Sequence, residues 1–178
     1  MKETPEVKAV KDNLVSTAFA PIRRIVTGHD PNGKAVVWLD SAASNHKASN
    51  PKVQSTLIWS TDETPAPYLI TADAGAKLIG TAPPAGGSRF AVIEFQPGAT
   101  AHGLHRTDTI DYVICICGEI DMELDDSRVT MRAGDVMVQL GTNHAWINRA
   151  TTTARVAFVL LDGTPKRPGS LASGQNAR

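Results

Sequence analysis

Cysteine is scarce in this sequence, and neither sign of charge is in excess. Cys115 and Cys117 are the only two cysteines, and side chains two residues apart on one strand are too far from each other for a mutual disulfide. A chain without a disulfide framework suits a reducing compartment, so we expect a cytoplasmic protein. The 18 basic and 18 acidic residues cancel, so overall charge favours neither nucleic acid nor a membrane surface as a partner.

Long apolar runs are also missing. The longest fall far short of the roughly 20 residues that a membrane-spanning helix needs. Residues 1–20 lack the compact apolar segment of a secretory signal. A length of 178 residues suits one domain. We expect a helix or arm over residues 1–20, a single domain over residues 21–163, and a flexible C-terminal tail over residues 164–178, where apolar residues are few.

Short segments of β-forming residues, separated by turn residues, make up most of the chain. The Asp-Pro and Asn-Gly pairs at residues 30–33 predict the reversal of a hairpin over residues 22–39. Polar residues 40–51 predict a loop, and residues 61–87 a longer loop that is a lid, a partner contact or a slack insertion. Further strands are predicted at residues 53–60, 89–95, 104–118, 119–124, 128–131, 136–140, 144–149 and 155–161. This succession is typical of an all-β barrel or sandwich.

Residues 104–118 predict a strand with two different faces, because alternate side chains of a strand point to opposite sides. One face carries His105, Thr107, Thr109, Asp111, Val113, Cys115 and Cys117, and the other carries Ile110, Tyr112, Ile114 and Ile116. Such a strand suits a barrel whose polar face lines a pocket and whose apolar face packs under a second layer. We expect an N-terminal hairpin to provide that cover, from the same chain or from the partner in a homodimer.

Residues 134–148 complement this strand. A Gly-Thr-Asn turn at residues 141–143 leads into His144, Trp146 and Asn148, which share one face of the next strand. If both strands face one cavity, His144 meets His105 and Asp111. Two imidazoles and a carboxylate are a common donor set for Zn, Fe, Mn or Ni.

The first of these stretches resembles the first motif of the cupin family, G-x5-H-x-H-x3,4-E-x6-G. Gly98 precedes His105 by one residue more than the motif asks. Thr107 stands in place of the second His and Asp111 in place of the Glu, while Gly118 follows at the motif's spacing.

The second stretch resembles the second cupin motif, G-x5-P-x-G-x2-H-x3-N. Gly134, Gly141, His144 and Asn148 match it, although the first gap is one residue shorter and Gln139 replaces the Pro. The resemblance covers residues 87–163 and implies a jelly-roll β-barrel of the cupin type with an N-terminal arm or hairpin.

The resemblance also implies roles for individual residues. His105, Asp111 and His144 would be the metal ligands for a divalent Zn, Mn, Fe or Ni ion, but Thr107 is a poor replacement for the missing His. A three-ligand site, a weakened site and no metal are therefore all open. The same three residues are the candidate catalytic groups, and Thr107, Trp146 and Cys115 are the candidate substrate-binding groups.

Two further histidines are less clearly placed. His102 lies three residues before His105 and would face away in a regular strand, unless Gly103 makes the backbone irregular. His29 lies in the hairpin turn, from which it reaches a cavity only if the hairpin folds over its own barrel or a partner's.

Four functions are compatible with these residues. The first is a lyase or isomerase, such as a decarboxylase or dehydratase, acting on a small oxygenated organic acid or carbonyl compound. A metal would polarise its oxygen, and His144 or Asp111 would carry the proton. The second is a dioxygenase with Fe(II) on the same residues, the third a barrel that binds a small ligand without reaction, and the fourth a sugar-nucleotide epimerase. The fourth ranks last because the motif region has no Arg or Lys cluster for a diphosphate.

Overall fold

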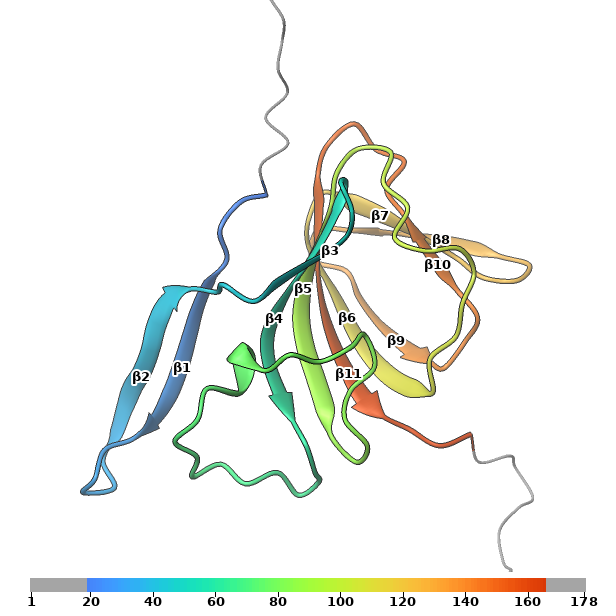
Figure 1. Cartoon of the computed structure of the whole chain (residues 1–178). Coiled ribbons are helices and arrows are strands. Elements are labelled where there is room, and N and C mark those ends of the chain that lie inside the picture. Colours follow the sequence, from blue (N-terminus) through green and yellow to red (C-terminus); the bar gives the residue numbers. More distant parts are fainter. Residues whose placement is uncertain (1–18, 166–178) are drawn as a thin grey trace, which may run out of the picture.

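Eleven β-strands and one short 3₁₀ turn make up residues 19–165, which are the residues that the computed structural model describes (Figure 1). The expected N-terminal helix or arm over residues 1–20 and the expected tail over residues 164–178 fall almost entirely outside this range. Within it, no helix is long and apolar enough to cross a membrane.

Two antiparallel sheets form the barrel, and the predicted all-β jelly-roll fold is confirmed. The six-stranded sheet has the order β3-β4-β5-β11-β6-β9, and the three-stranded sheet has the order β10-β7-β8. The strands are β3 His46–Asn50, β4 Val53–Thr61, β5 Ser88–Phe95, β6 Thr109–Cys117, β7 Glu119–Glu123, β8 Arg128–Arg132, β9 Val136–Leu140, β10 Ala145–Ile147 and β11 Ala154–Asp162. The predicted loop over residues 40–51 is wrong for most of its length. Residues 40–42 belong to the strand Ala35–Ala42, and the polar segment β3 forms an edge strand on β4.

The alternation of buried and exposed side chains predicted for residues 104–118 holds over most of strand β6. Along β6 the side chains of Thr109, Asp111, Val113 and Cys115 are buried, whereas the residues between them are exposed. The inner face continues into a hydrophobic core made by Val113, Cys115, Ile120, Met122, Met131, Trp146, Val156 and Phe158. Each fully buried aliphatic or aromatic side chain of this kind stabilises the fold by about 1.5–3 kcal/mol. This packing closes one end of the barrel.

The predicted N-terminal hairpin is present as β1 (Arg23–His29) and β2 (Ala35–Ala42), a two-stranded sheet of its own. It stands beside the barrel and points away from it (Figure 1). Ile25 is 52 % exposed and Val37 is 61 % exposed, so part of the hairpin's apolar surface has no cover from the described residues.

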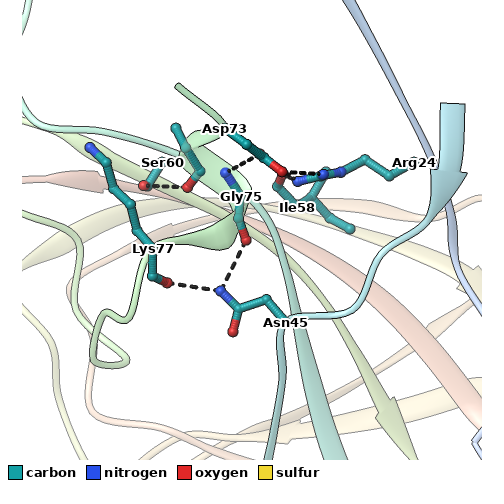
Figure 2. Close-up of polar contacts among 8 residues, drawn as sticks. Arg24, Asn45, Ile58, Ser60, Asp73, Gly75 and Lys77 are labelled. Carbon is teal, nitrogen blue, oxygen red and sulfur yellow. Dashed lines mark hydrogen bonds and ion pairs between the residues drawn. The ribbon is translucent and has the colours of Figure 1, made fainter. Parts of the chain in front are cut away.

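One buried ion pair fixes this hairpin to the barrel (Figure 2). Arg24 of β1 donates to both carboxylate oxygens of Asp73, at 2.9 and 2.6 Å. Asp73 caps the 3₁₀ turn η1 (Ala74–Ala76) by accepting from the amide of Gly75. A Cβ at position 75 would lie 2.5 Å from the main-chain oxygen of Ile58 and would also displace the Arg24 guanidinium, so glycine is required there. The long segment 61–87 is therefore fastened to β1 at its middle.

The outer surface of β6 and β9 is an exposed apolar face, as the alternation predicts. We call the following set the apolar face: Ile110, Tyr112, Ile114 and Ile116 of β6, with Val136, Val138 and Leu140 of β9. Tyr112 is 47 % exposed and Val138 is 60 % exposed. Because β9 is the last strand of its sheet, its outer backbone edge is also open within the described part of the chain.

Candidate active-site cavity

A cavity of about 330 Å³ opens at the other end of the barrel interior. Its polar lining comes from Lys47, Ser49, Ser55, Thr81, Arg89, His102, His105, Thr107, Asp111 and His144. Its apolar lining comes chiefly from Val53, Ile93, Phe95, Trp146, Phe158 and Leu160. A cavity with apolar walls and a few convergent polar groups is typical of a site for a small organic molecule.

Main-chain hydrogen bonds bring the two motif histidines together. The amide of His105 donates to the carbonyl of His144 at 2.9 Å, and the amide of His144 donates to the carbonyl of His105 at 2.8 Å. The predicted continuous strand over residues 104–118 is therefore wrong at its start. β6 begins only at Thr109, and residue 105 pairs with the turn before β10 through one isolated bridge. This bridge places both imidazoles in the cavity, with ring centroids 4.4 Å apart.

Each imidazole is held by its Nδ1 atom. His105 Nδ1 lies 2.9 Å from the carbonyl of Gly103, and His144 Nδ1 lies 2.9 Å from the carbonyl of Thr142. A carbonyl can only accept, so both contacts favour the tautomer with the proton on Nδ1. In that tautomer Nε2 carries the free lone pair. Each ring can therefore act through Nε2 as a proton acceptor or as a ligand.

Gln139 is a second partner of His144. In the sequence it was noted only as the residue that replaces the Pro of the second motif. Its side-chain Nε2 atom is placed 2.8 Å from His144 Nδ1, and both residues are buried. An Nδ1 that carries a proton for the Thr142 carbonyl cannot also accept from this N–H group, so we assign the amide with its nitrogen and oxygen exchanged. Gln139 Oε1 has no other partner among the described residues. With the oxygen turned toward Nδ1, the amide accepts from the Nδ1 proton and its own buried oxygen is satisfied.

Asp111 is buried on the inner face of β6, 4 % exposed. Burial raises the pKa of its carboxyl group, and the nearby Thr109 hydroxyl and the charge of Arg89 oppose this rise. Burial also lowers the pKa of His144. Burial in the cavity thus disfavours the charged form of each of these two groups. Asp111 lines the cavity, and its buried Oδ1 atom has no hydrogen-bond partner among the described residues.

The predicted metal ligands are only partly assembled. His105 and His144 lie side by side with free Nε2 atoms, which suits a metal. Among residues 19–165, however, no group of three or more His, Cys, Asp or Glu side chains is placed to hold an ion. Catalytic metal sites ordinarily have three protein ligands. The residues present do not form such a site, and the divalent metal stays a prediction.

The other predicted site residues have mixed outcomes. Thr107 and Trp146 line the cavity. Cys115 does not: it is 1 % exposed in the hydrophobic core, where its Sγ faces the carbonyls of Cys117 and Gly118. Its assignment to substrate binding is corrected, since the inner face of β6 lines the cavity at one end and the closed core at the other.

The two less certain histidines have separate outcomes. His102 lines the cavity and its ring centroid lies 5.5 Å from that of His105. The expectation that it faces away fails, because residues 101–104 are not a regular strand. His29 is exposed at the end of β1 and is not part of the cavity lining.

Arg89 is the site residue that sequence reasoning missed. It lies on β5, 6 % exposed, and donates from Nη2 to Ser55 Oγ at 2.7 Å. A usable signal was available: Arg89 has the same parity as Ala91, Ile93 and Phe95, the inner face of a strand already predicted.

Comparison with known proteins gives one family. Residues 91–160 match the family model described as a cupin domain. A protein named cupin-domain-containing oxidoreductase fogC, from Aspergillus ruber, is 34 % identical over 91 % of this chain and 87 % of its own length. The cupin-domain-containing oxidoreductase virC of Hypocrea virens is 36 % identical over 90 % of this chain and 88 % of its own.

A shorter match has a higher identity. Phomopsin biosynthesis cluster protein C' of Diaporthe leptostromiformis is 46 % identical over 83 residues, which are 45 % of this chain and 43 % of that protein. The chain therefore spans less than half the length of this relative.

Proposed function

Since the chain belongs to the cupin family, we propose that it is an enzyme of small-molecule biosynthesis that moves a proton next to a carbonyl group. The reaction class is that of an isomerase or lyase acting on a small oxygenated organic acid or carbonyl compound. Relatives named as biosynthesis-cluster proteins and oxidoreductases support an enzyme of small-molecule metabolism. The cavity residues support the acid–base chemistry.

The proposed step uses two groups. Nε2 of neutral His144 takes a proton from the carbon beside the carbonyl, and the electron pair of that C–H bond moves toward the carbonyl oxygen. Asp111, protonated, gives this oxygen a hydrogen bond and then the proton, so that an enol forms. His144 then returns its proton to another carbon while Asp111 takes back the proton of the enol oxygen, which completes an isomerisation and restores both groups. No part of this step uses a metal.

The observation that carries the proposal is the fixed orientation of His144. Thr142 and Gln139 hold its Nδ1, while Nε2 is left for a bound molecule in a cavity that also contains the unpartnered Oδ1 of Asp111. A base held in one tautomer beside a buried acid is the arrangement that proton transfer requires.

Exchange of carbon-bound hydrogen tests the proposal. Phenylpyruvate and the neutral ketone phenylacetone are incubated with the protein in D₂O, and loss of the proton signal is followed by NMR. We expect exchange above the buffer rate, reduced about 10²–10⁴-fold in His144→Gln. The matched control is His29→Gln, whose exposed side chain lies on the hairpin. Exchange that is unchanged in His144→Gln, or absent with all carbonyl probes, contradicts the proposal.

A second candidate is an oxidoreductase, and the names of fogC and virC favour it. Oxygen consumption measured in the same samples, before and after incubation with Fe(II), distinguishes the two. Oxygen uptake that depends on His105 and His144, without hydrogen exchange, would support the oxidoreductase. Binding with neither reaction would support a ligand-binding barrel.

A further inference from the structure

Arg89 is a buried cation with very few partners. Of the five N–H donors of a guanidinium, one has a described partner, the Oγ of Ser55 at 2.7 Å. Its Nε is buried without a partner among residues 19–165. The residue lines the cavity between apolar walls that include Ile93, Phe158 and Leu160.

The other arginines with little exposure differ from Arg89 in one respect. Arg24 pairs with Asp73, and Arg155 pairs with Glu94 at 2.9 Å. Within the described residues Arg89 forms no such ion pair, because no carboxylate lies within 4 Å of its guanidinium. Asp111 interacts with this cation only from beyond ion-pair distance. A buried charge without a counter-charge in contact is unfavourable, so the position favours an anion from outside the chain.

The sheet places this cation in register with the proposed acid. Leu160 of β11 pairs with Arg89 on one side and with Asp111 on the other, and Asp111 pairs with Gln139. Arg89 and Asp111 therefore share the inner face two strands apart, about 10 Å between Cα atoms. A ligand that contacts Arg89 has room to extend toward Asp111 and the histidines within a cavity of about 330 Å³.

We propose that Arg89 and Ser55 form an anion subsite that binds the carboxylate of an organic acid with an aromatic or aliphatic body. Guanidinium and carboxylate match as planar, two-pronged partners, and Ser55 Oγ adds a hydroxyl beside them. Phe95, Trp146 and Phe158 provide the walls for the apolar body. The anion subsite itself does not depend on the proposed function. Only its consequence does: the bound acid is the substrate, and its carbonyl end points to His144.

Binding of a matched pair of probes tests the subsite. Benzoate and benzamide have the same size and shape, but only benzoate is an anion. Isothermal titration of the full chain should give a dissociation constant at least tenfold lower for benzoate. Arg89→Met should bring the two constants to within about twofold of each other, and Arg89→Lys should give an intermediate ratio, because it keeps the charge but loses the planar fork. Arg132→Met, an exposed arginine on β8 outside the cavity lining, is the control and should retain a preference of at least fivefold.

Folding of the variants is read from melting temperature. An apolar side chain in place of an uncompensated buried cation should melt no lower than the wild type. If Arg89 is instead the internal counter-charge of Asp111, Arg89→Met will melt lower, Asp111→Asn will restore the loss, and benzoate will not be preferred. That outcome overturns the subsite, as does equal binding of the two probes by the wild type.

Failure of the subsite and failure of the proposed reaction give different results. His144→Gln should reduce hydrogen exchange about 10²–10⁴-fold, while benzoate is still preferred over benzamide. An equal affinity for benzoate and benzamide together with rapid, His144-dependent exchange of phenylacetone removes the subsite and keeps the reaction. A benzoate preference without any exchange removes the reaction and keeps the subsite.

Discussion

At the scale of single residues, chemistry depends on which atom of each imidazole is held. The carbonyls of Gly103 and Thr142 occupy the Nδ1 atoms of His105 and His144, and Gln139 adds a second contact to His144. The reactive atom is therefore chosen by neighbours that take no part in the reaction. Second contacts of this kind are part of how a site sets the protonation of its histidines.

Replacement of Gln139 should disturb His144 without removing it. In Gln139→Leu we expect hydrogen-exchange activity to fall by about tenfold, because the Nδ1 tautomer loses one of its two acceptors. Ring ¹⁵N chemical shifts of His144 should show a larger fraction of the Nε2-protonated tautomer. Gln54→Leu, on the half-buried part of β4, is the control. Equal activity with an unchanged tautomer ratio would show that Thr142 alone orients the ring.

The buried imidazole also gives a pH dependence of stability. Because burial lowers the pKa of His144, the unfolded chain takes up a proton below about pH 6.5 that the folded chain does not. The free energy of unfolding should therefore decrease as pH falls from about 6.5 toward the folded pKa. Urea unfolding at a series of pH values measures this slope. His144→Gln should flatten it and His29→Gln should not; an unaltered slope in both would contradict the prediction.

From the sequence, the face of the strand on which each side chain lies could be predicted, but not how far the cavity extends along that face. Alternation placed Asp111 and Cys115 on the same inner face of β6, and the structure agrees. It could not tell that the cavity ends between them, because the closure comes from Ile120, Met122 and Met131 on other strands. Arg89 was overlooked because an arginine on a strand is usually read as an exposed residue, although its parity pointed inward.

At the scale of elements, regular strands were predictable and irregular connections were not. The hairpin over residues 22–39 and the strands on either side of the motifs were recognised from turn residues and alternation. The bridge between residues 105 and 144 was not, since it joins two irregular segments that are 39 positions apart through main-chain atoms only. Main-chain pairing of this kind leaves no mark on the side-chain pattern.

The stability of the hairpin β1–β2 should depend more on the ion pair between Arg24 and Asp73 than on any exposed ion pair. Arg24→Met leaves the mostly buried pair with Asp73 broken, and we expect a loss of about 1–3 kcal/mol in the free energy of unfolding. Amide hydrogen exchange should increase in β1 and β2. Arg23→Met removes the adjacent exposed pair with Asp40 and should change the free energy of unfolding much less, because solvent screens an exposed pair. Similar losses in both variants would contradict this account.

The same ion pair responds to acid. The hydrogen bond from Arg24 holds the pKa of Asp73 below its usual value, so its contribution is complete above about pH 4, near the unfolded pKa, and is lost as pH falls through the folded pKa. We expect hairpin amides to lose protection first in a hydrogen-exchange series toward low pH. In Asp73→Asn this acid-dependent step should be absent, and its persistence would assign the step to another carboxylate.

At the scale of the whole molecule, the apolar face is a large hydrophobic surface that no described residue covers. Seven aliphatic or aromatic residues of β6 and β9 lie exposed together, and large patches of this kind usually mark an interface. The hairpin of the same chain points away and carries its own exposed Ile25 and Val37. The predicted homodimer is thus expected to place the hairpin of one copy on the apolar face of the other.

Two substitutions test this assembly together. Light scattering of the full chain should give twice the monomer mass of 18.9 kDa. Val138→Lys on the apolar face and Ile25→Lys on the hairpin should each raise the dissociation constant at least tenfold, because either one buries an unpaired ammonium group. Val129→Lys, exposed on β8 of the other sheet, should not. Dissociation by Val138→Lys alone would assign the contact to face against face, and a monomeric wild type would rule out the dimer.

The bridge between residues 105 and 144 has a wider consequence for how such a barrel changes over time. The hydrogen bonds that bring these positions together run between amides and carbonyls, which every residue but proline supplies. Exchange of either imidazole for another side chain therefore leaves the two positions facing each other. The backbone pairing therefore fixes where the reactive side chains lie, while the side chains themselves can differ. Thr107, at a position where the motif has histidine, is one such difference.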